Sequence, residues 1–497
     1  MSISVPSDKH SSRVRALLLF ALAVLACLSV VLINGEALYY FDTGSYIRQG
    51  SVALNTILPP VYEGSVSGGT YAADQDSTAT GSRSLIYGLI MASFFRANAL
   101  FAMPVLHLAV VLLTAWLLAR TVSRYLDGDY GTPVITAVPL LAAACTSMPF
   151  YVAFMMPDIF APVLLIGIAA LTAFGRVMQI WEMVLISGLA LFSILLHPSH
   201  LAVAGLMIPF VLLVALCRRT PGKWRPVIIM IVILTLALAE RKAFQVTVES
   251  TTNKEVVYTP HITARLIVDG PGMDYLNEVC PNTDIPTCAL HEALSWSDDP
   301  YRMTPSHIIF ERSDRLGSFR LMTPENQKRV ALAQRDFAQA VFLSRPISTS
   351  LALAENGYRQ VLRYSITMTI PSDVEINNAR NLARLNPSQL HLIQSGVLSE
   401  ERVWIETADV LHGIIYAASF VFIVVVLLRP RSVPTDVKLF ALFILIGIAV
   451  NALVCGGVSQ PADRYGARVM WLLPFTAALL YLVQRSHAPR NATGDLV

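Results

Sequence analysis

Long apolar runs constrain this chain more than any other feature of its sequence. A helix needs about 20 mostly apolar residues to cross the hydrocarbon core of a bilayer. Of the 497 residues, 54% are hydrophobic and 14% are charged, whereas about a quarter are charged in a typical soluble protein. The sequence therefore predicts an all-α polytopic membrane protein with about ten transmembrane helices. The predicted spans are 14–34, 98–119, 134–151, 159–174, 182–197, 201–217, 226–241, 407–428, 438–456 and 468–485.

Basic residues in the short loops predict the orientation of these spans, because lysine and arginine concentrate on the cytoplasmic side. With ten spans, basic residues in six segments share one side, among them Arg15, Arg120, Arg176, Arg218 and Arg429. The N- and C-terminal tails, 1–13 and 486–497, are then cytoplasmic. The extracytoplasmic side receives the loop 35–97 and the long segment 242–406.

Segment 242–406 is more polar than the rest and separates spans 1–7 (14–241) from spans 8–10 (407–485). At about 165 residues it can bury a modest core. Thr323 and Pro324 are typical of a helix start. Apolar residues at helical spacing predict helices over 324–343 and 347–366. We expect a mostly helical extracytoplasmic insert.

Cys280 and Cys288 lie within this insert and enclose a turn-rich loop. A disulfide between them suits an extracytoplasmic compartment, and two unpaired thiols are the alternative. The remaining four cysteines lie in or beside predicted spans and are expected to be packing residues.

Asp42 stands just beyond the first span, in the sequence Phe41-Asp42-Thr43-Gly44-Ser45-Tyr46. A carboxylate at the bilayer surface is partly desolvated, which strengthens it as a base. It can take a proton from an acceptor hydroxyl or hold a divalent cation, so a divalent cation is the one candidate cofactor. The structural alternative is an acid that solvates a helix end. Asp158, between the third and fourth predicted spans, is a second candidate or simply an N-cap.

Several basic residues fall on the same predicted side as Asp42. Arginine binds phosphate with a planar fork of donors, so Arg83, Arg464 and Arg468 are candidate phosphate ligands. Interfacial anchoring is the alternative for Arg468, and an ion pair with its acidic neighbour is the alternative for Arg464. His197 and His200, at the end of the fifth span, are candidates for a phosphate contact or a metal pair, or form a plain polar turn.

The glycine- and serine-rich stretch 64–82, with Asp74 and Asp76, is interpreted as a loop that covers the site. It has no phosphate-loop or dinucleotide pattern. The net charge of +3 without a basic, aromatic-rich run argues against a nucleic-acid partner.

Four of these short motifs together resemble those of the type C membrane glycosyltransferases, which use polyprenyl-phosphate-linked sugars. The resemblance rests on Asp42 to Tyr46 after the first span, Asp158 in the next outside turn, Arg83 to Tyr87, and Asp463 to Arg468 before the last span. The stretch that begins at Arg83 lacks both prolines of the family's R-x-P-x-Y-P-L motif. The stretch 264–271 and the two cysteines after it resemble uncharacterised alphaproteobacterial membrane proteins.

The resemblance implies a bacterial inner-membrane enzyme with its active site on the periplasmic side. Asp42 would be the base or a metal-linked acid, Asp158 would assist it, and Arg83 and Arg464 would face the donor phosphate. Tyr46, His197, His200 and Arg468 are further candidate ligands of the substrate or its phosphate. The partners would be a polyprenyl-phosphate sugar, a cell-envelope acceptor and the bilayer. Two alternatives stay open. One is a polysaccharide polymerase or ligase that uses His261, His291 and His307 of the insert. The other is a lipid-linked glycan transporter with charged residues inside its spans, for which His107, Asp409 and His412 are the candidates.

Overall fold

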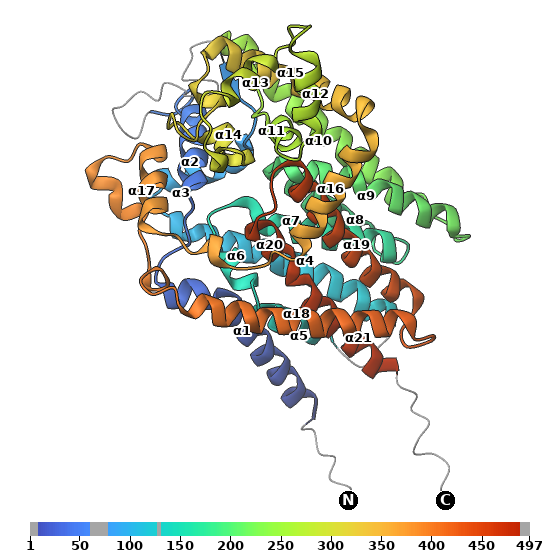
Figure 1. The fold of residues 1–497 in the computed structure, drawn as a ribbon. Helices are drawn as coiled ribbons and strands as arrows, with labels where there is room; N and C mark the ends of the chain where they lie inside the picture. Colours follow the sequence, from blue (N-terminus) through green and yellow to red (C-terminus); the bar gives the residue numbers. More distant parts are fainter. Residues whose placement is uncertain (1–7, 60–77, 127–130, 488–497) are drawn as a thin grey trace, which may run out of the picture.

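The computed structural model describes residues 8–59, 78–126 and 131–487, and within these ranges the chain is all-α, as predicted. It has 21 α-helices there, and its only sheet in the same ranges is a parallel pair of three-residue strands, β1 (Thr78–Thr80) and β2 (Glu255–Val257) (Figure 1). The predicted covering loop 64–82 lies outside the described residues except for 78–82, so Asp74 and Asp76 are not placed.

Seven described helical segments are long and apolar enough to cross a membrane. They are Val14–Asn34, Leu100–Leu126, Pro157–Phe174, Pro198–Cys217, Trp404–Leu428, Thr435–Val458 and Asp463–Ser486. The chain is therefore a multi-pass helical membrane protein by the length and composition of its helices.

Three further predicted spans fall on helices outside that set. α5 (Thr132–Ala144) has 13 residues and ends before Cys145, and the rest of that span belongs to the short helix α6 (Met148–Ala153). α8 (Ile180–Leu196) has 17 residues. α10 (Arg225–Thr252) is longer than predicted but carries Glu240, Arg241 and Lys242 near its middle.

The other helices of the bundle lie close to their predicted positions. They are α1 (Asp8–Asn34), α4 (Met103–Leu126), α7 (Phe160–Phe174), α9 (Pro198–Cys217), α18 (Trp404–Leu428), α19 (Thr435–Val458), α20 (Asp463–Met470) and α21 (Leu472–His487). Every residue of α7 is buried, and this helix packs against α4, α8 and α19. An all-apolar helix of this kind suits the centre of a bundle.

Two short helices follow α1 and position the first part of the candidate site. They are α2 (Phe41–Leu54) and α3 (Leu85–Arg96), and they pack closely against each other. A Cβ at Gly50 of α2 would lie 1.9 Å from the backbone oxygen of Gly88 in α3. The two backbones can approach this closely only because neither residue has a side chain.

Segment 242–406 contributes to two separate apolar cores. One is the core of the main helix bundle. The other, called the second cluster below, has its buried residues between Val257 and Val341. It includes α11 (His261–Val268), α12 (Pro271–Val279), α13 (Cys288–Leu294), α14 (Pro305–Phe310) and α15 (Pro324–Ser344). The later helices α16 (Pro346–Val361) and α17 (Asp373–Ala383) instead pack against α19 and α2 of the main bundle (Figure 1). This part of the segment therefore packs with the bundle.

The predicted helix pair in this segment agrees with the structure. Thr323 caps α15 by accepting a hydrogen bond from the Asn326 N–H, and Arg345 separates α15 from α16. Cys280 and Cys288 are joined by a disulfide, with their Cα atoms 5.5 Å apart.

Candidate active site

Asp42 lies in the first turn of α2, and this turn is tied to the middle of the chain. The Tyr40 backbone N–H donates to Thr43 Oγ1 at 3.0 Å, which satisfies a donor at the helix start. The Thr43 hydroxyl in turn donates to the Met155 carbonyl at 3.2 Å. The start of α2 is thereby fixed beside the segment that carries Asp158.

The carboxylate of Asp42 pairs with the guanidinium of Arg83, which lies just before α3. The close packing of α2 against α3 brings the two side chains together. Asp42 is 21% exposed and Arg83 is 13% exposed. The pair therefore lies at the edge of the protein interior, where a ligand can still reach it.

Asp158 lies deeper, in a single 3-10 turn (Pro157–Ile159) before α7, and its side chain is fully buried. Arg464 donates from Nε to both carboxylate oxygens at 3.1 Å and from Nη2 to Oδ2 at 2.7 Å. Arg468 Nη1 donates to Oδ1 at 3.2 Å. Two guanidiniums therefore compensate one buried carboxylate, which would otherwise be very costly to bury.

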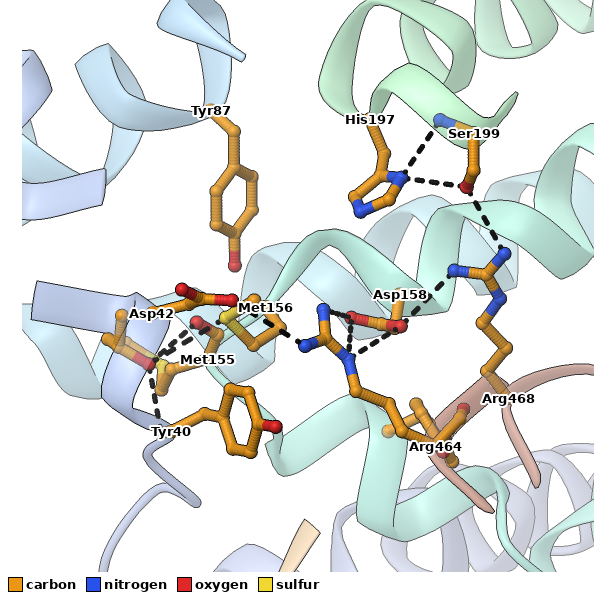
Figure 2. Close-up of polar contacts among 12 residues, drawn as sticks. Tyr40, Asp42, Tyr87, Met155, Met156, Asp158, His197, Ser199, Arg464 and Arg468 are labelled. Atoms are coloured by element: carbon orange, nitrogen blue, oxygen red, sulfur yellow. Dashed lines mark hydrogen bonds and ion pairs between the residues drawn. The ribbon is translucent and has the colours of Figure 1, made fainter. Parts of the chain in front are cut away.

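Arg464 also links the two acids. Its Nη1 lies 3.8 Å from Asp42 Oδ2 while its other nitrogens bind Asp158. Figure 2 shows the two carboxylates on opposite sides of this guanidinium. Asp42 and Asp158 thus converge through Arg464. Five side chains form one ionic cluster and alternate in charge in the order Arg83, Asp42, Arg464, Asp158 and Arg468.

The two arginines of α20 have other partners than their structural alternatives suggested, although Arg464 does form an ion pair. Arg464 binds Asp158 rather than its neighbour Asp463, whose nearest arginine is Arg363 at 3.7 Å. Arg468 is fully buried and also donates to Asn451 Oδ1 at 2.7 Å. Both guanidiniums face the inside of the bundle.

Side chains from three other helices hold the backbone of α20 in place. Tyr151 donates to the Arg464 carbonyl at 2.6 Å, and Ser147 donates to the Ala467 carbonyl at 2.6 Å. Asn451 donates to the Tyr465 carbonyl at 2.9 Å, and Gln360 donates to the Ala462 carbonyl at 2.9 Å. The positions of Arg464 and Arg468 are therefore set by α6, α16 and α19.

Aromatic rings pack against the guanidinium of Arg464. The Tyr40 ring centroid is 4.9 Å from Arg464 Cζ, and that of Phe154 is 5.7 Å away. Contacts of this kind attract a guanidinium to the ring face. Tyr46, a predicted ligand, is buried and packs edge-on against Tyr87 with centroids 5.0 Å apart. Burial raises the pKa of the Tyr46 hydroxyl, so it stays neutral.

The two histidines have separate structural partners. His197 caps α9 through Nδ1, which accepts from the Ser199 N–H at 3.2 Å, and the Ser199 hydroxyl lies 3.3 Å from Arg468 Nη2. His200 Nδ1 donates to the Ser193 carbonyl at 2.7 Å. Their ring centroids are 5.1 Å apart. His197 thus borders the ionic cluster, and His200 lies behind it.

His261, at the start of α11, is a further residue near Asp42 and Arg83. Burial lowers its pKa to about 4, an effect that the charge of Arg83 reinforces and the charge of Asp42 opposes. His261 is therefore neutral at physiological pH. Its position near Asp42 could not be predicted from the sequence, because more than two hundred residues separate the two.

Asp42 and Asp158 are the two acids of the site that could serve as ligands for a divalent cation. Asp42 offers one carboxylate, but both of its neighbours are guanidiniums, which repel a metal ion. Asp158 is enclosed by two more. No group of three histidine, cysteine or acidic side chains with metal-binding geometry occurs in the part of the chain that the structure describes. In this arrangement the two acids do not fit a metal.

The arrangement suits an anion better. A partly exposed carboxylate lies between two guanidiniums, and the cluster as a whole has three positive and two negative groups. A phosphate that reached Arg83 and Arg464 would find donors already oriented, and Asp42 would be next to it.

Comparison of the chain with protein-family models, with curated proteins and with solved structures gave no match in any of the three. The helices themselves establish a multi-pass helical membrane protein.

Proposed function

We propose that this protein is a membrane glycosyltransferase that moves a sugar from a polyprenyl-phosphate donor to a cell-envelope acceptor outside the cytoplasm. The observation that carries the proposal is the position of Asp42, a partly exposed carboxylate shared by Arg83 and Arg464. It joins a proton acceptor to two phosphate-binding groups at one place. The type C resemblance of the sequence points to the same chemistry.

The proposal includes the topology of ten spans with cytoplasmic termini in a bacterial inner membrane. Under this topology α5 with α6, α8 and α10 also cross the bilayer, and 242–406 lies on the periplasmic side. All five members of the ionic cluster then fall on that side. Their convergence supports this topology, because residues on opposite faces of a bilayer cannot share one site.

The reaction follows from the positions of these groups. The oxygen of an acceptor hydroxyl attacks the anomeric carbon of the sugar, and Asp42 takes the hydroxyl proton. The bond between the anomeric carbon and the phosphate oxygen breaks, and its electron pair stays on the phosphate. Arg83 and Arg464 stabilise the charge of that leaving group.

The ion pairs of Asp42 fit a step that depends on the donor. In the free protein both guanidiniums occupy the Asp42 carboxylate. A donor phosphate competes for the same guanidiniums and so frees the carboxylate. Asp158 and Arg468 do not take part in the proton transfer; they position Arg464 from behind.

The alternatives receive less support from the described residues. A polymerase or ligase would use the histidines of the insert. His291 instead binds Asn277, and His307 binds the Tyr301 carbonyl. Of these three histidines, His261 is the one whose pKa is affected by the charge of Asp42. For a transporter, His107 binds the Val152 carbonyl and Asp409 accepts from the Ile366 N–H. These contacts serve local packing rather than a path across the bundle.

Sugar transfer in lipid nanodiscs tests the proposal. The full-length protein is given a panel of polyprenyl-phosphate sugars, with cell-envelope extract as acceptor, and a parallel panel of sugar nucleotides. Transfer from a lipid-linked donor is expected. Transfer from sugar nucleotides alone would contradict the proposal.

A further inference from the structure

The helix α16 is amphipathic, but its two sides are the reverse of those of a helix on a water-soluble protein. Such a helix buries its apolar side and exposes its polar side. In α16 the buried side, which packs against α19, is small and polar. It consists of Thr349, Asn356, Gly357 and Gln360. The opposite side carries the exposed apolar side chains called the apolar stripe below. They are Ile347, Leu351, Tyr358 and Leu362, which are 59–75% exposed.

The apolar stripe is continuous along the helix. Its four members are four, seven and four residues apart, which places them on one face. The two charged side chains of α16, Glu355 and Arg359, lie at the edge of this face and pair with each other. Exposing such a stripe to water is unfavourable, so an apolar partner is expected.

α16 lies beside the last turns of α19, which is one of the helices that can cross a membrane. An added Cβ at Gly457 would lie 3.0 Å from the side chain of Leu353, and one at Gly357 would lie 3.4 Å from the Cα atom of Leu453. The residue number rises in α16 as it falls in α19, so the two helices are antiparallel. α16 therefore runs from the end of α19 back toward the middle of that span.

The chain after α16 reaches well into the length of α18, another helix that can cross a membrane. The Ile366 N–H donates to Asp409 Oδ1 at 3.0 Å, and an added Cβ at Gly413 would lie 2.5 Å from the Tyr364 hydroxyl oxygen. Gly413 is nine residues into α18, about 13 Å from the start of that helix. Irregular backbone at such a depth must be buried in protein. Ile366 meets this requirement, since it is fully buried.

The outer side of α19 indicates what covers the apolar stripe. Leu442, Ala449 and Leu453 are exposed and Ile446 is partly exposed, at helical spacing along this span. In a bilayer the exposed apolar side of a span contacts acyl chains, which are as apolar as leucine. Leu453 lies against Gly357 of α16 and is still 40% exposed. The lipid-facing side of α19 thus continues onto α16.

We propose that α16 and the turn after it form a re-entrant membrane segment, whose apolar stripe faces lipid acyl chains. The segment enters the bilayer from the side on which α19 ends and leaves it on the same side. Part of 242–406 then lies within the membrane, while both ends of this segment stay on one side of it. The inference uses the packing of α16 against α18 and α19 and is independent of sugar transfer.

Spin labelling of the full-length protein in lipid nanodiscs tests this inference. Cys145→Ala and Cys217→Ala remove the two exposed free thiols, and a nitroxide is then attached at Tyr358→Cys or at Tyr301→Cys. Tyr301 is the matched control, because it belongs to the second cluster and is 69% exposed against 67% for Tyr358. Relaxation of the label by molecular oxygen, which concentrates in lipid, is compared with relaxation by a charged nickel chelate, which stays in water.

We expect oxygen to relax the label at position 358 at least about threefold more than the nickel chelate does, because a charged solute is excluded from the hydrocarbon core. The label at position 301 should show the reverse. Stronger relaxation by nickel at both positions would show that α16 lies in water. Protection from both reagents at position 358 would show that protein, such as a second copy of the chain, covers the apolar stripe. Either result overturns the inference.

A series of labels along the apolar stripe tests the re-entry itself, since its members span about 22 Å of helix. The ratio of oxygen to nickel relaxation should rise from Ile347→Cys to Leu362→Cys, because α16 runs inward beside α19. A flat series would place α16 along the membrane surface and contradict re-entry. Every labelled side chain is exposed, so each variant should keep the thermal midpoint of wild type.

Discussion

Arg464 holds Asp158 with three hydrogen-bond contacts of 2.7–3.1 Å, although 306 residues separate the two in the chain. The same guanidinium reaches to 3.8 Å from Asp42. One buried side chain thus sets the distance between the two acids.

Replacing Arg464 should destabilise the protein strongly. Arg464→Gln leaves Asp158 buried with only Arg468 as a cation, and removing one partner of a buried ion pair costs about 3–5 kcal/mol. Arg363→Gln is the control, since Arg363 is 52% exposed and 3.7 Å from Asp463; an exposed pair of this kind contributes under about 1 kcal/mol. Denaturant unfolding in detergent measures both. Equal losses in the two variants would contradict the burial argument.

The close approach of α2 and α3 should tolerate no side chain. A Cβ at Gly50 would meet the Gly88 oxygen at 1.9 Å, so Gly50→Ala must push the helices apart and move Asp42 away from Arg83. We expect a loss of about 1–3 kcal/mol in stability and a large loss of transfer activity. Gly188→Ala in α8, where a Cβ has no neighbour within 4 Å, should leave both unchanged. A fully active Gly50→Ala protein would mean that the pairing of Asp42 with Arg83 does not need this crossing.

His261 should make the protein sensitive to mild acid. Its pKa is lowered from 6.5 to about 4 in the folded protein, so the fold favours the neutral ring. The unfolded chain binds the proton first, and stability falls as the pH drops from about 6.5 to 4. His261→Gln should flatten this part of the profile of thermal midpoint against pH. His291→Gln, which removes a contact to Asn277 in the second cluster, should keep the wild-type slope. An unchanged slope in His261→Gln would exclude His261 as the source.

The disulfide should stabilise the second cluster rather than the ionic site. Cys280 and Cys288 are eight residues apart and border α12 and α13. Closing a loop of that length contributes about 2–3 kcal/mol in the chain-entropy model. The Cys280→Ser, Cys288→Ser double variant should be cleaved faster by protease within 257–341 while its transfer activity persists. Loss of activity without faster cleavage there would contradict this division.

The sequence predicted the long helices well because an apolar run leaves few choices inside a bilayer. α18 and α19 lie within a few residues of their predicted ranges. The predicted span 134–151 is broken at residues 145–147, and α20 is separate from α21. Hydropathy averages over such breaks, since the residues on both sides of each break are still mostly apolar.

The candidate site was predicted one residue at a time. Asp42, Asp158, Arg464 and Arg468 were each singled out as charged residues beside a predicted span, and Arg83 as an arginine in the outside loop 35–97. Their pairing depends on contacts between segments that are mostly far apart in the chain. Asn451, which binds Arg468, was missed. A polar residue inside the apolar run 438–456 was the available signal, since such residues in spans usually have a partner.

Asp42 is proposed to be the base of a lipid-phosphate sugar transfer. The most direct measurement is the rate of that transfer in nanodiscs by wild type, Asp42→Asn and Glu36→Gln. Glu36 lies in the same loop but outside the ionic cluster, so it controls for a general loss of charge. We expect Asp42→Asn to lose at least about a hundredfold in rate with an unchanged thermal midpoint. Glu36→Gln should keep near wild-type activity. Equal rates for wild type and a folded Asp42→Asn protein would contradict the role of Asp42 as the base.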